Sequence, residues 1–330
     1  MQIRNIIQIG LCVLASMLVG CTGSKQGQAG SQADQMQTIA PTSAFDADSA
    51  YRFVSDQVAF GPRVSGSAAH RACGDWIVAK LRGWGYHIIE QAFTGKDYFG
   101  KSIQGRNIIA TLAPEATPRV LLMAHWDTRA VADHDSQHSR RSEPILGADD
   151  GGSGVGVLLE LARQHAQEHV GVELDFVFFD LEDGGNNGDN DSWCLGSQHW
   201  SKHPHQTDYQ AEFGILLDMV GAKKAKFYWE GHSRAYAAPI LYKVWEEARA
   251  LGFGDYFISA GGGAMIDDHV PVIQNRGIPA IDIINHNPHT DQGFGEHWHT
   301  HGDNMNIIDR KTLGAVGQTV HTMLRNKYRK

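Results

Sequence analysis

Histidine and acidic residues gather at a few places along the chain, and together these residue types could bind a metal ion. They are His125 and Asp127 in "AHWD", Asp149 and Asp150 in "GADDGG", Glu182 and Asp183 in "DLEDGG", Asp218 in "LLDMVG", and His299, His301 and Asp303 in "WHTHGD". Histidine nitrogens combined with carboxylate oxygens are a ligand set that proteins use for zinc. A bound zinc ion can polarise a carbonyl group or activate a water molecule, so these residues are candidates for a catalytic centre.

Apolar runs in the sequence indicate which elements position these residues. We predict buried strands at 119–127, 172–180, 213–221 and 278–285, because each run is almost continuously apolar and carries polar residues at or near its end. Amphipathic segments at 69–85, 153–167, 236–252 and 309–326 predict helices. This alternation indicates an α/β fold: a three-layer sandwich with a mostly parallel central β-sheet flanked by helices. Such sheets bind ligands beyond the carboxyl ends of their strands.

The composition is typical of a globular protein, with 42% hydrophobic and 20% charged residues in 330. The formal net charge is −8 and no long basic run occurs, which argues against nucleic acid as a partner. No internal repeat or second linker interrupts residues 44–330, so we predict one catalytic domain there, of unknown oligomeric state. Two cysteines of this domain, Cys73 and Cys194, either pair or remain free buried thiols.

The N-terminus has the features of an export signal. Arg4 precedes the apolar stretch "IIQIGLCVLASMLVG", which is short for a membrane span. This stretch runs into Cys21 as "LVGC", which resembles the lipobox of bacterial lipoproteins and implies cleavage before Cys21 and a lipid on its sulfur. An ordinary signal peptide is the alternative interpretation. We predict a lipoprotein signal peptide at 1–21, a flexible tether at 22–43, and an exported protein anchored by lipid to a bacterial membrane, facing the periplasm or the cell surface.

An ordered set of motifs resembles a known enzyme superfamily. These motifs are "GPRVSGS" at 61–67, "HWD", "GADDGGSGV", "FFDLED" followed by "LGS", "DDHVPVIQNRGIPAIDI" and "WHTHGDN". Their order is similar to that in the zinc aminopeptidase and glutaminyl cyclase superfamily, and the resemblance covers roughly residues 45–328. Each motif is weak alone, but the ordered set is specific. The resemblance implies the α/β fold of that superfamily and a zinc-dependent site.

The resemblance implies one of two metal centres. In the aminopeptidase branch two zinc ions share a bridging aspartate while a glutamate activates a metal-bound water, and the matching ligand positions are His125, Asp150, Asp183, Asp218 and His299. In the cyclase branch a single zinc is held by Asp150, Asp183 and His299. For a one-zinc enzyme we expect His125 and Asp127 to remain beside the metal site without binding the metal.

Three features favour the cyclase branch. Trp298 directly precedes His299, as in the "WHT" motif of glutaminyl cyclases. Asp267 in "IDDHVP" matches a residue of the cyclase proton network, and "LLDMVGA" resembles the cyclase strand that carries a further acid, Asp218. One departure is that the tryptophan which usually follows the paired acids is missing from "GGNNGDND". We expect Trp193 to fill that part of the pocket.

For the cyclase branch the resemblance implies a glutaminyl-peptide cyclotransferase. Such an enzyme converts the N-terminal glutamine of peptides or proteins to pyroglutamate and releases ammonia. Zinc polarises the γ-amide, Glu182 shuttles protons, and Asp218 and Asp267 form a hydrogen-bond chain to Glu182. Trp193 and Trp298 line the substrate pocket. The alternatives are a di-zinc aminopeptidase that removes N-terminal residues from peptides, and a lipoprotein that binds peptides without catalysis.

The other polar residues of these motifs are expected to shape loops. We expect His297 and His301 to be loop residues, and Asp149 to orient a loop or a ligand. The resemblance also suggests a cis peptide bond between Asp150 and Gly151. Because such a bond costs about 3–4 kcal/mol, it would need a site-shaping role.

Overall fold

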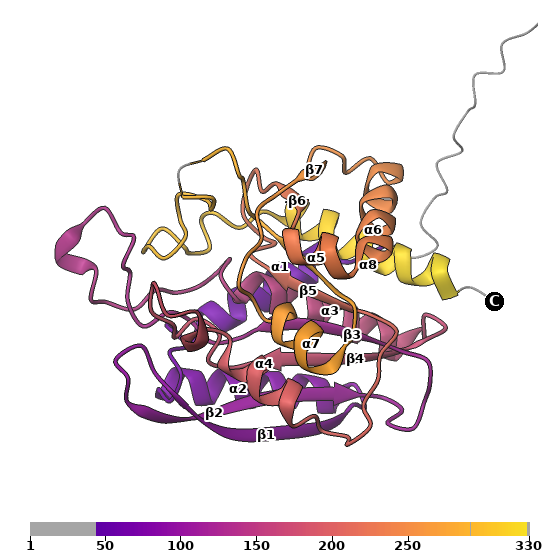
Figure 1. The fold of residues 1–330 in the computed structure, drawn as a ribbon, viewed down its shortest axis with the longest axis horizontal. Helices are drawn as coiled ribbons and strands as arrows, with labels where there is room; N and C mark the ends of the chain where they lie inside the picture. Colours follow the sequence, from indigo (N-terminus) through magenta and orange to yellow (C-terminus); the bar gives the residue numbers. More distant parts are fainter. Residues whose placement is uncertain (1–43, 291, 329–330) are drawn as a thin grey trace, which may run out of the picture. The chain divides into compact units, whose positions relative to one another are not determined.

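The computed structural model describes residues 44–290 and 292–328 (Figure 1). The predicted signal peptide, the tether and the lipidation site at Cys21 lie outside these residues and stay predictions. Among the helices in the described ranges, none is long and apolar enough to cross a membrane.

A mixed β-sheet of six strands, in the order β1-β2-β4-β3-β5-β8, forms the centre of the fold. The strands β4, β3, β5 and β8 run parallel to one another, whereas β2 is antiparallel to both β1 and β4. The strands are β1 (His87–Lys96), β2 (Ser102–Thr111), β3 (Arg119–His125), β4 (Glu173–Phe179), β5 (Gly214–Asp218) and β8 (Ala280–Ile284).

The parallel strands are those with continuous apolar sequence. Every residue of β3, β4, β5 and β8 is buried, as expected for strands covered on both faces. The strands β1 and β2 form an edge hairpin that sequence analysis did not predict. Exposed and partly buried residues dominate β1, whose apolar residues are interrupted by polar ones, so the hairpin lacks the uniform apolar run that marks the inner strands.

Helices cover both faces of the sheet (Figure 1). The larger hydrophobic core joins one face to helices α1 (Ala47–Val58), α2 (Ala68–Gly83), α3 (Gly152–Gln167), α6 (Ala238–Ala250) and α8 (Arg310–Tyr328). A smaller core joins the opposite face to α4 (Leu195–Lys202) and α7 (His269–Arg276). The prediction of a three-layer α/β sandwich is therefore confirmed.

The remaining elements lie outside the main sheet. The short strands β6 (Phe227–Trp229) and β7 (Phe257–Gly261) pair in parallel, and α5 (Gly231–Tyr236) follows β6. Two 3-10 turns, η1 (His138–Arg140) and η2 (Asn190–Ser192), lie in loops. The helix predicted over 236–252 is in fact split, because α5 ends at Tyr236 and α6 begins at Ala238. Pro239 in the first turn of α6 marks this start, since proline lacks the N–H that a helix interior needs.

Candidate active site

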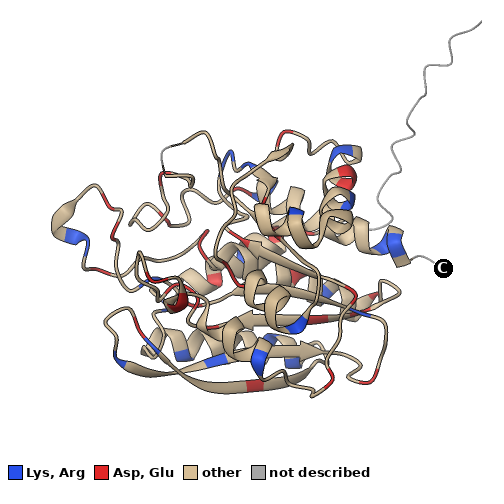
Figure 2. Ribbon diagram, viewed as in Figure 1, with Lys and Arg blue, Asp and Glu red and all other residues tan. Residues whose placement is uncertain are grey.

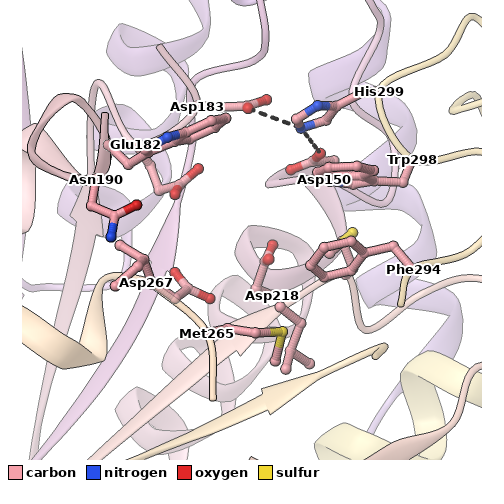
Figure 3. Close-up of a pocket in the computed structure, with 14 residues that line it drawn as sticks. Asp150, Glu182, Asp183, Asn190, Asp218, Met265, Asp267, Phe294, Trp298 and His299 are labelled. Carbon is pink, nitrogen blue, oxygen red and sulfur yellow. Dashed lines mark ion pairs between the residues drawn. The ribbon is translucent and has the colours of Figure 1, made fainter. Parts of the chain in front are cut away.

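The carboxyl ends of the inner strands carry the candidate residues to one edge of the sheet (Figure 3). His125 ends β3, Asp218 ends β5, and Glu182 with Asp183 follows shortly after β4. Because these strands are parallel neighbours, residues far apart in sequence meet at the same edge. Asp150 precedes α3 and completes this group.

Asp150, Asp183 and His299 form a candidate zinc site. Each offers one ligand atom, and these atoms lie within 4.8 Å of one another. The Nε2 atom of His299 is 3.2 Å from Asp183 Oδ1 and 3.7 Å from Asp150 Oδ2. The Oδ2 atoms of both aspartates are buried and have no hydrogen-bond partner in the protein. Burying unpaired carboxylate oxygens is costly, so a cation held between these three residues fits the site.

A second group of possible ligands shares Asp150 with the first. His125, Asp150 and Asp218 also place one ligand atom each within 4.8 Å of one another. The Nε2 atom of His125 lies 3.1 Å from Asp150 Oδ1 and 3.2 Å from Asp218 Oδ1. Asp150 therefore lies between two sets of ligands, which is the arrangement expected of an aspartate that bridges two metal ions.

Glu182 is adjacent to Asp183 in the chain but faces different partners. Its Oε1 atom accepts a hydrogen bond of 3.3 Å from the thiol of Cys194. Glu182, Cys194 and Asp267 bring one polar atom each within 4.8 Å of one another. Burial raises the pKa of Glu182 well above its usual range, and the Asp267 carboxylate raises it further, against the opposing effect of His125. A carboxyl group with this environment can both accept and donate a proton.

Two further buried acids, Asp267 and Asp218, line the same cavity as Glu182. Burial raises the pKa of Asp267 to about 7, with a further contribution from the charge of Asp218. Burial likewise raises the pKa of Asp218 to about 6, in spite of its bond to His125. Sequence analysis placed these two acids at the site but missed Asp282, which is fully buried on β8 and interacts with Asp267. The signal for Asp282 was an acid inside the apolar strand "IPAIDI".

Aromatic side chains wall the cavity, whose volume is about 240 Å³. The rings of Trp298 and His299 stack at 3.8 Å, and Phe294 packs on Trp298 at 4.5 Å. Both predicted pocket residues, Trp193 and Trp298, line this cavity together with Phe294. The ring of Trp193 is 6.2 Å from that of His299 and nearly parallel to it. Figure 3 shows Phe294 and Trp298 on one side of the cavity and Glu182 with Asp267 on the other.

Two carboxylates, those of Asp127 and Asp303, accept hydrogen bonds from the backbone N–H groups of the candidate ligands Asp183 and Asp150 and of the residues that precede them. Asp127 accepts hydrogen bonds from the N–H groups of Glu182 at 3.1 Å and Asp183 at 3.2 Å, so it fixes the turn after β4. Asp303 accepts from the N–H groups of Asp149 at 2.7 Å and Asp150 at 3.1 Å. Asp127 therefore holds the backbone that carries Asp183, which agrees with its expected position beside the metal site.

The neighbouring loop residues also have defined partners. The carboxylate of Asp149 accepts from Gly221 N–H at 2.7 Å and pairs with His297 Nε2 at 2.9 Å. His301 Nδ1 lies 2.7 Å from Asp135 Oδ2, away from the ligand clusters. The predicted cis bond between Asp150 and Gly151 is wrong, because the cis bond found in the described residues is Thr117–Pro118. A positive φ of 77° at Gly151 turns the chain into α3 instead, which a glycine adopts without strain.

Arg129 and Asp133 also belong to the site, and sequence analysis missed both. Arg129 is fully buried, and its guanidinium group donates to both carboxylate oxygens of Asp133, at 2.8 and 2.7 Å. The Oδ1 atom of Asp133 lies 3.3 Å from His299 Nδ1. The signal for these residues was an arginine and an acid shortly after "HWD", in "TRAVADHD".

Comparisons with known proteins point to one family. A model described as Peptidase family M28 matches residues 107–324. The crystal structure of the glutaminyl cyclase from Porphyromonas gingivalis is 57% identical, with a TM-score of 0.85, and the match covers 87% of this chain and 100% of that chain.

A protein with a different description is similar to nearly the same degree. The structure of a Zn-dependent exopeptidase from Parabacteroides distasonis is 52% identical with a TM-score of 0.84, over 86% of this chain and 99% of that chain. Among curated proteins, the glutaminyl-peptide cyclotransferase of Bos taurus is 26% identical over 249 residues, which are 66% of this chain and 65% of the bovine protein. Solved structures described as a glutaminyl cyclase and as an exopeptidase therefore share this fold.

Proposed function

The chain belongs to peptidase family M28, and on that premise we propose that it is a zinc-dependent glutaminyl-peptide cyclotransferase. Its substrates are peptides or proteins with an N-terminal glutamine, which it converts to pyroglutamate with release of ammonia. One observation carries the proposal: Glu182, with its raised pKa, lines the same small cavity as Asp150, Asp183 and His299. The 57% identity to a glutaminyl cyclase across that protein's whole length supports it.

The reaction needs little beyond positioning and proton transfer. The α-amine of glutamine attacks its own γ-carbonyl carbon, so both reactants belong to one residue and the cavity must fold the side chain back. A cavity of about 240 Å³ walled by Trp193, Phe294 and Trp298 suits a single folded side chain. A zinc ion bound by the three ligands would polarise the γ-carbonyl and stabilise the negative charge on its oxygen.

Glu182 transfers the proton between the two nitrogens. As the new C–N bond forms, the carboxylate of Glu182 takes a proton from the α-amine. As the bond to the side-chain nitrogen breaks, Glu182 returns that proton to it, and ammonia leaves. Burial and the charge of Asp267 raise the pKa of Glu182, and the charge of Asp218 in turn raises the pKa of Asp267, so Glu182 binds the transferred proton more strongly than an exposed carboxylate would.

The second candidate function is a di-zinc aminopeptidase, favoured by the cluster of His125, Asp150 and Asp218 and by the similar exopeptidase. The two proposals differ in the products and in the number of bound metal ions. The test incubates the zinc-loaded protein lacking residues 1–21 with two peptides, one beginning with Gln and one with Leu, and follows them by mass spectrometry. Loss of ammonia from the Gln peptide alone is expected.

Other outcomes have clear meanings. Stepwise loss of whole N-terminal residues, together with two zinc ions per chain in native mass spectrometry, would replace the cyclase with the aminopeptidase.

For the cellular location, we propose an exported enzyme carried on a lipid attached to Cys21, supported by the "LVGC" motif. Mutation of Cys21 to serine should release the protein from bacterial membranes, and unchanged membrane recovery would contradict the lipid anchor.

A further inference from the structure

We propose that Asp133, clamped by Arg129, is a positioning residue that orients His299 for metal binding and couples it to Asp183. The proposal rests on the metal-binding part of the proposed function and is independent of whether the protein cyclises glutamine. It concerns residues of the loop after β3, outside the motifs that supply the metal ligands.

The first step is the tautomer of His299. Its Nε2 atom faces Asp183 and Asp150, so a metal bound there needs the Nε2 lone pair and a proton on Nδ1. Nδ1 is buried and makes no hydrogen bond within the described residues, and Asp133 Oδ1 lies 3.3 Å from it, close enough to accept a hydrogen bond once Nδ1 carries that proton. Asp133 therefore selects the ring form that can bind the metal.

The loop also restrains the backbone of His299. His299 has a φ of 55°, a left-handed conformation that is unusual for a residue with a side chain. The N–H group of His134 donates to the carbonyl oxygen of His299 at 3.2 Å. Contacts from two adjacent residues, Asp133 and His134, thus reach the ring and the main chain of the same ligand.

Arg129 holds Asp133 in place and also contacts the turn that carries Asp183. Its Nε and Nη2 atoms hold the two oxygens of Asp133 as a fork, at 2.8 and 2.7 Å. Its Nη1 atom donates to the carbonyl oxygens of Asp183 at 3.0 Å and Gly185 at 3.1 Å. One buried guanidinium group therefore joins the partner of His299 to the turn that carries Asp183.

The planar shape of the guanidinium group matters as well as its charge. The centre of the group lies 4.8 Å from the ring of Trp193 and 5.1 Å from that of Tyr98. A lysine would keep the charge but could not bind a carboxylate as a fork and stack on these rings in the same way. Arg129 thereby links the metal ligands to Trp193, a wall of the cavity.

Asp135 provides a matched control in the same loop. It bonds to the Nδ1 and N–H of His301, at 2.7 and 3.0 Å, so it also holds a histidine of the segment that contains His299. His301 belongs to neither of the two ligand clusters built around Asp150. Asp135→Ala removes a comparable carboxylate–histidine contact without touching a proposed metal ligand.

The experiment measures metal binding by the full-length mature protein carrying Asp133→Ala, Asp133→Asn or Asp135→Ala. Zinc affinity is determined by competition with a chromophoric chelator, and the visible absorption of the cobalt(II)-substituted protein reports ligand geometry. Asp133→Ala should weaken zinc binding roughly 10- to 100-fold and change the cobalt spectrum, because it removes the outer partner of a metal-binding histidine. Asp133→Asn keeps an acceptor oxygen and should fall between Asp133→Ala and wild type.

Two results would overturn the proposal: equal zinc affinity in Asp133→Ala and Asp135→Ala, or a cobalt spectrum unchanged from wild type in Asp133→Ala. If Asp133→Ala does not fold, Arg129→Lys tests the same interaction by removing the fork that holds Asp133. A cobalt spectrum of Arg129→Lys equal to that of wild type would then overturn the proposal. Absence of cyclisation by the wild-type protein would count against the proposed function but leave this result readable, since zinc affinity is measured without substrate.

Discussion

At the scale of single residues, adjacent acids have separate tasks. Asp183 turns toward His299, while Glu182 turns toward Cys194 and Asp267. Leu181, immediately before them, has a φ of 56°, which bends the chain after β4 and helps the two side chains diverge. The pair can therefore bind a metal ion and transfer protons without competing for one position.

Exchange of Glu182 for glutamine separates these two tasks. Glu182→Gln keeps the size of the side chain but cannot accept the proton of the α-amine, so turnover should fall at least about 100-fold while zinc stays bound. His299→Ala should instead lose zinc. Activity on a Gln peptide and metal content by atomic emission measure both. A Glu182→Gln enzyme with a near-normal rate would show that another group transfers the proton.

At the scale of elements, the approach of α3 to β5 sets the distance between Asp150 and Asp218. Gly154 lies in the first turn of α3, and a Cβ atom there would lie 2.1 Å from the main-chain oxygen of Leu217. That contact is with backbone, which cannot rotate away. The helix can come this close to the strand because position 154 has no side chain.

Gly154→Ala should therefore push α3 away from β5. Overpacking of this kind costs about 3 kcal/mol of unfolding free energy, and the shift should also weaken metal binding through Asp150. The control is Gly83→Ala at the end of α2, where a Cβ would meet nothing within 4 Å. That exchange should leave stability unchanged or raise it by up to about 1 kcal/mol. Urea unfolding compares the two, and equal stability would contradict the close-approach argument.

At the scale of the whole molecule, ionisable groups are buried at both ends of the sheet. The acids of the site lie at the carboxyl ends of the strands, whereas His165 lies at the last turn of α3, at the opposite end. Burial lowers the pKa of His165 to about 3, with further contributions from His169 and His321. The buried ring is therefore neutral in the folded protein at neutral pH.

This histidine should make the protein less stable in acid. Below pH 6.5 the unfolded chain protonates His165 while the folded chain does not until about pH 3, so stability falls as the pH drops through this window. The loss between pH 7 and pH 5 should be on the order of 2 kcal/mol. His165→Asn should remove it, whereas the same exchange at the exposed His138 should not. Thermal melting at both pH values measures this, and parallel losses in the two variants would refute it.

Much of the fold followed from sequence periodicity. The apolar runs at 119–127 and 172–180 correctly predicted β3 and β4, since strands buried on both faces need apolar residues at every position. The β1–β2 hairpin was missed because β1 mixes polar and apolar residues without strict alternation and without the uniform apolar run of the inner strands. The family resemblance also predicted that His299 and Asp183 belong to one site, and His299 Nε2 lies 3.2 Å from Asp183 Oδ1, although His299 lies in the middle of the loop between β8 and α8.

The sequence alone determined which residues stand at the ends of buried strands, because apolar periodicity is local and the direction of parallel strands then dictates a common edge. Only the tertiary structure decided which atom of His299 faces the other ligands, that Asp133 and Arg129 support it, and that Asp150 lies between two ligand groups. These features depend on side-chain directions and on the packing of segments more than a hundred residues apart, such as Asp133 against His299. A local pattern carries no information about such contacts.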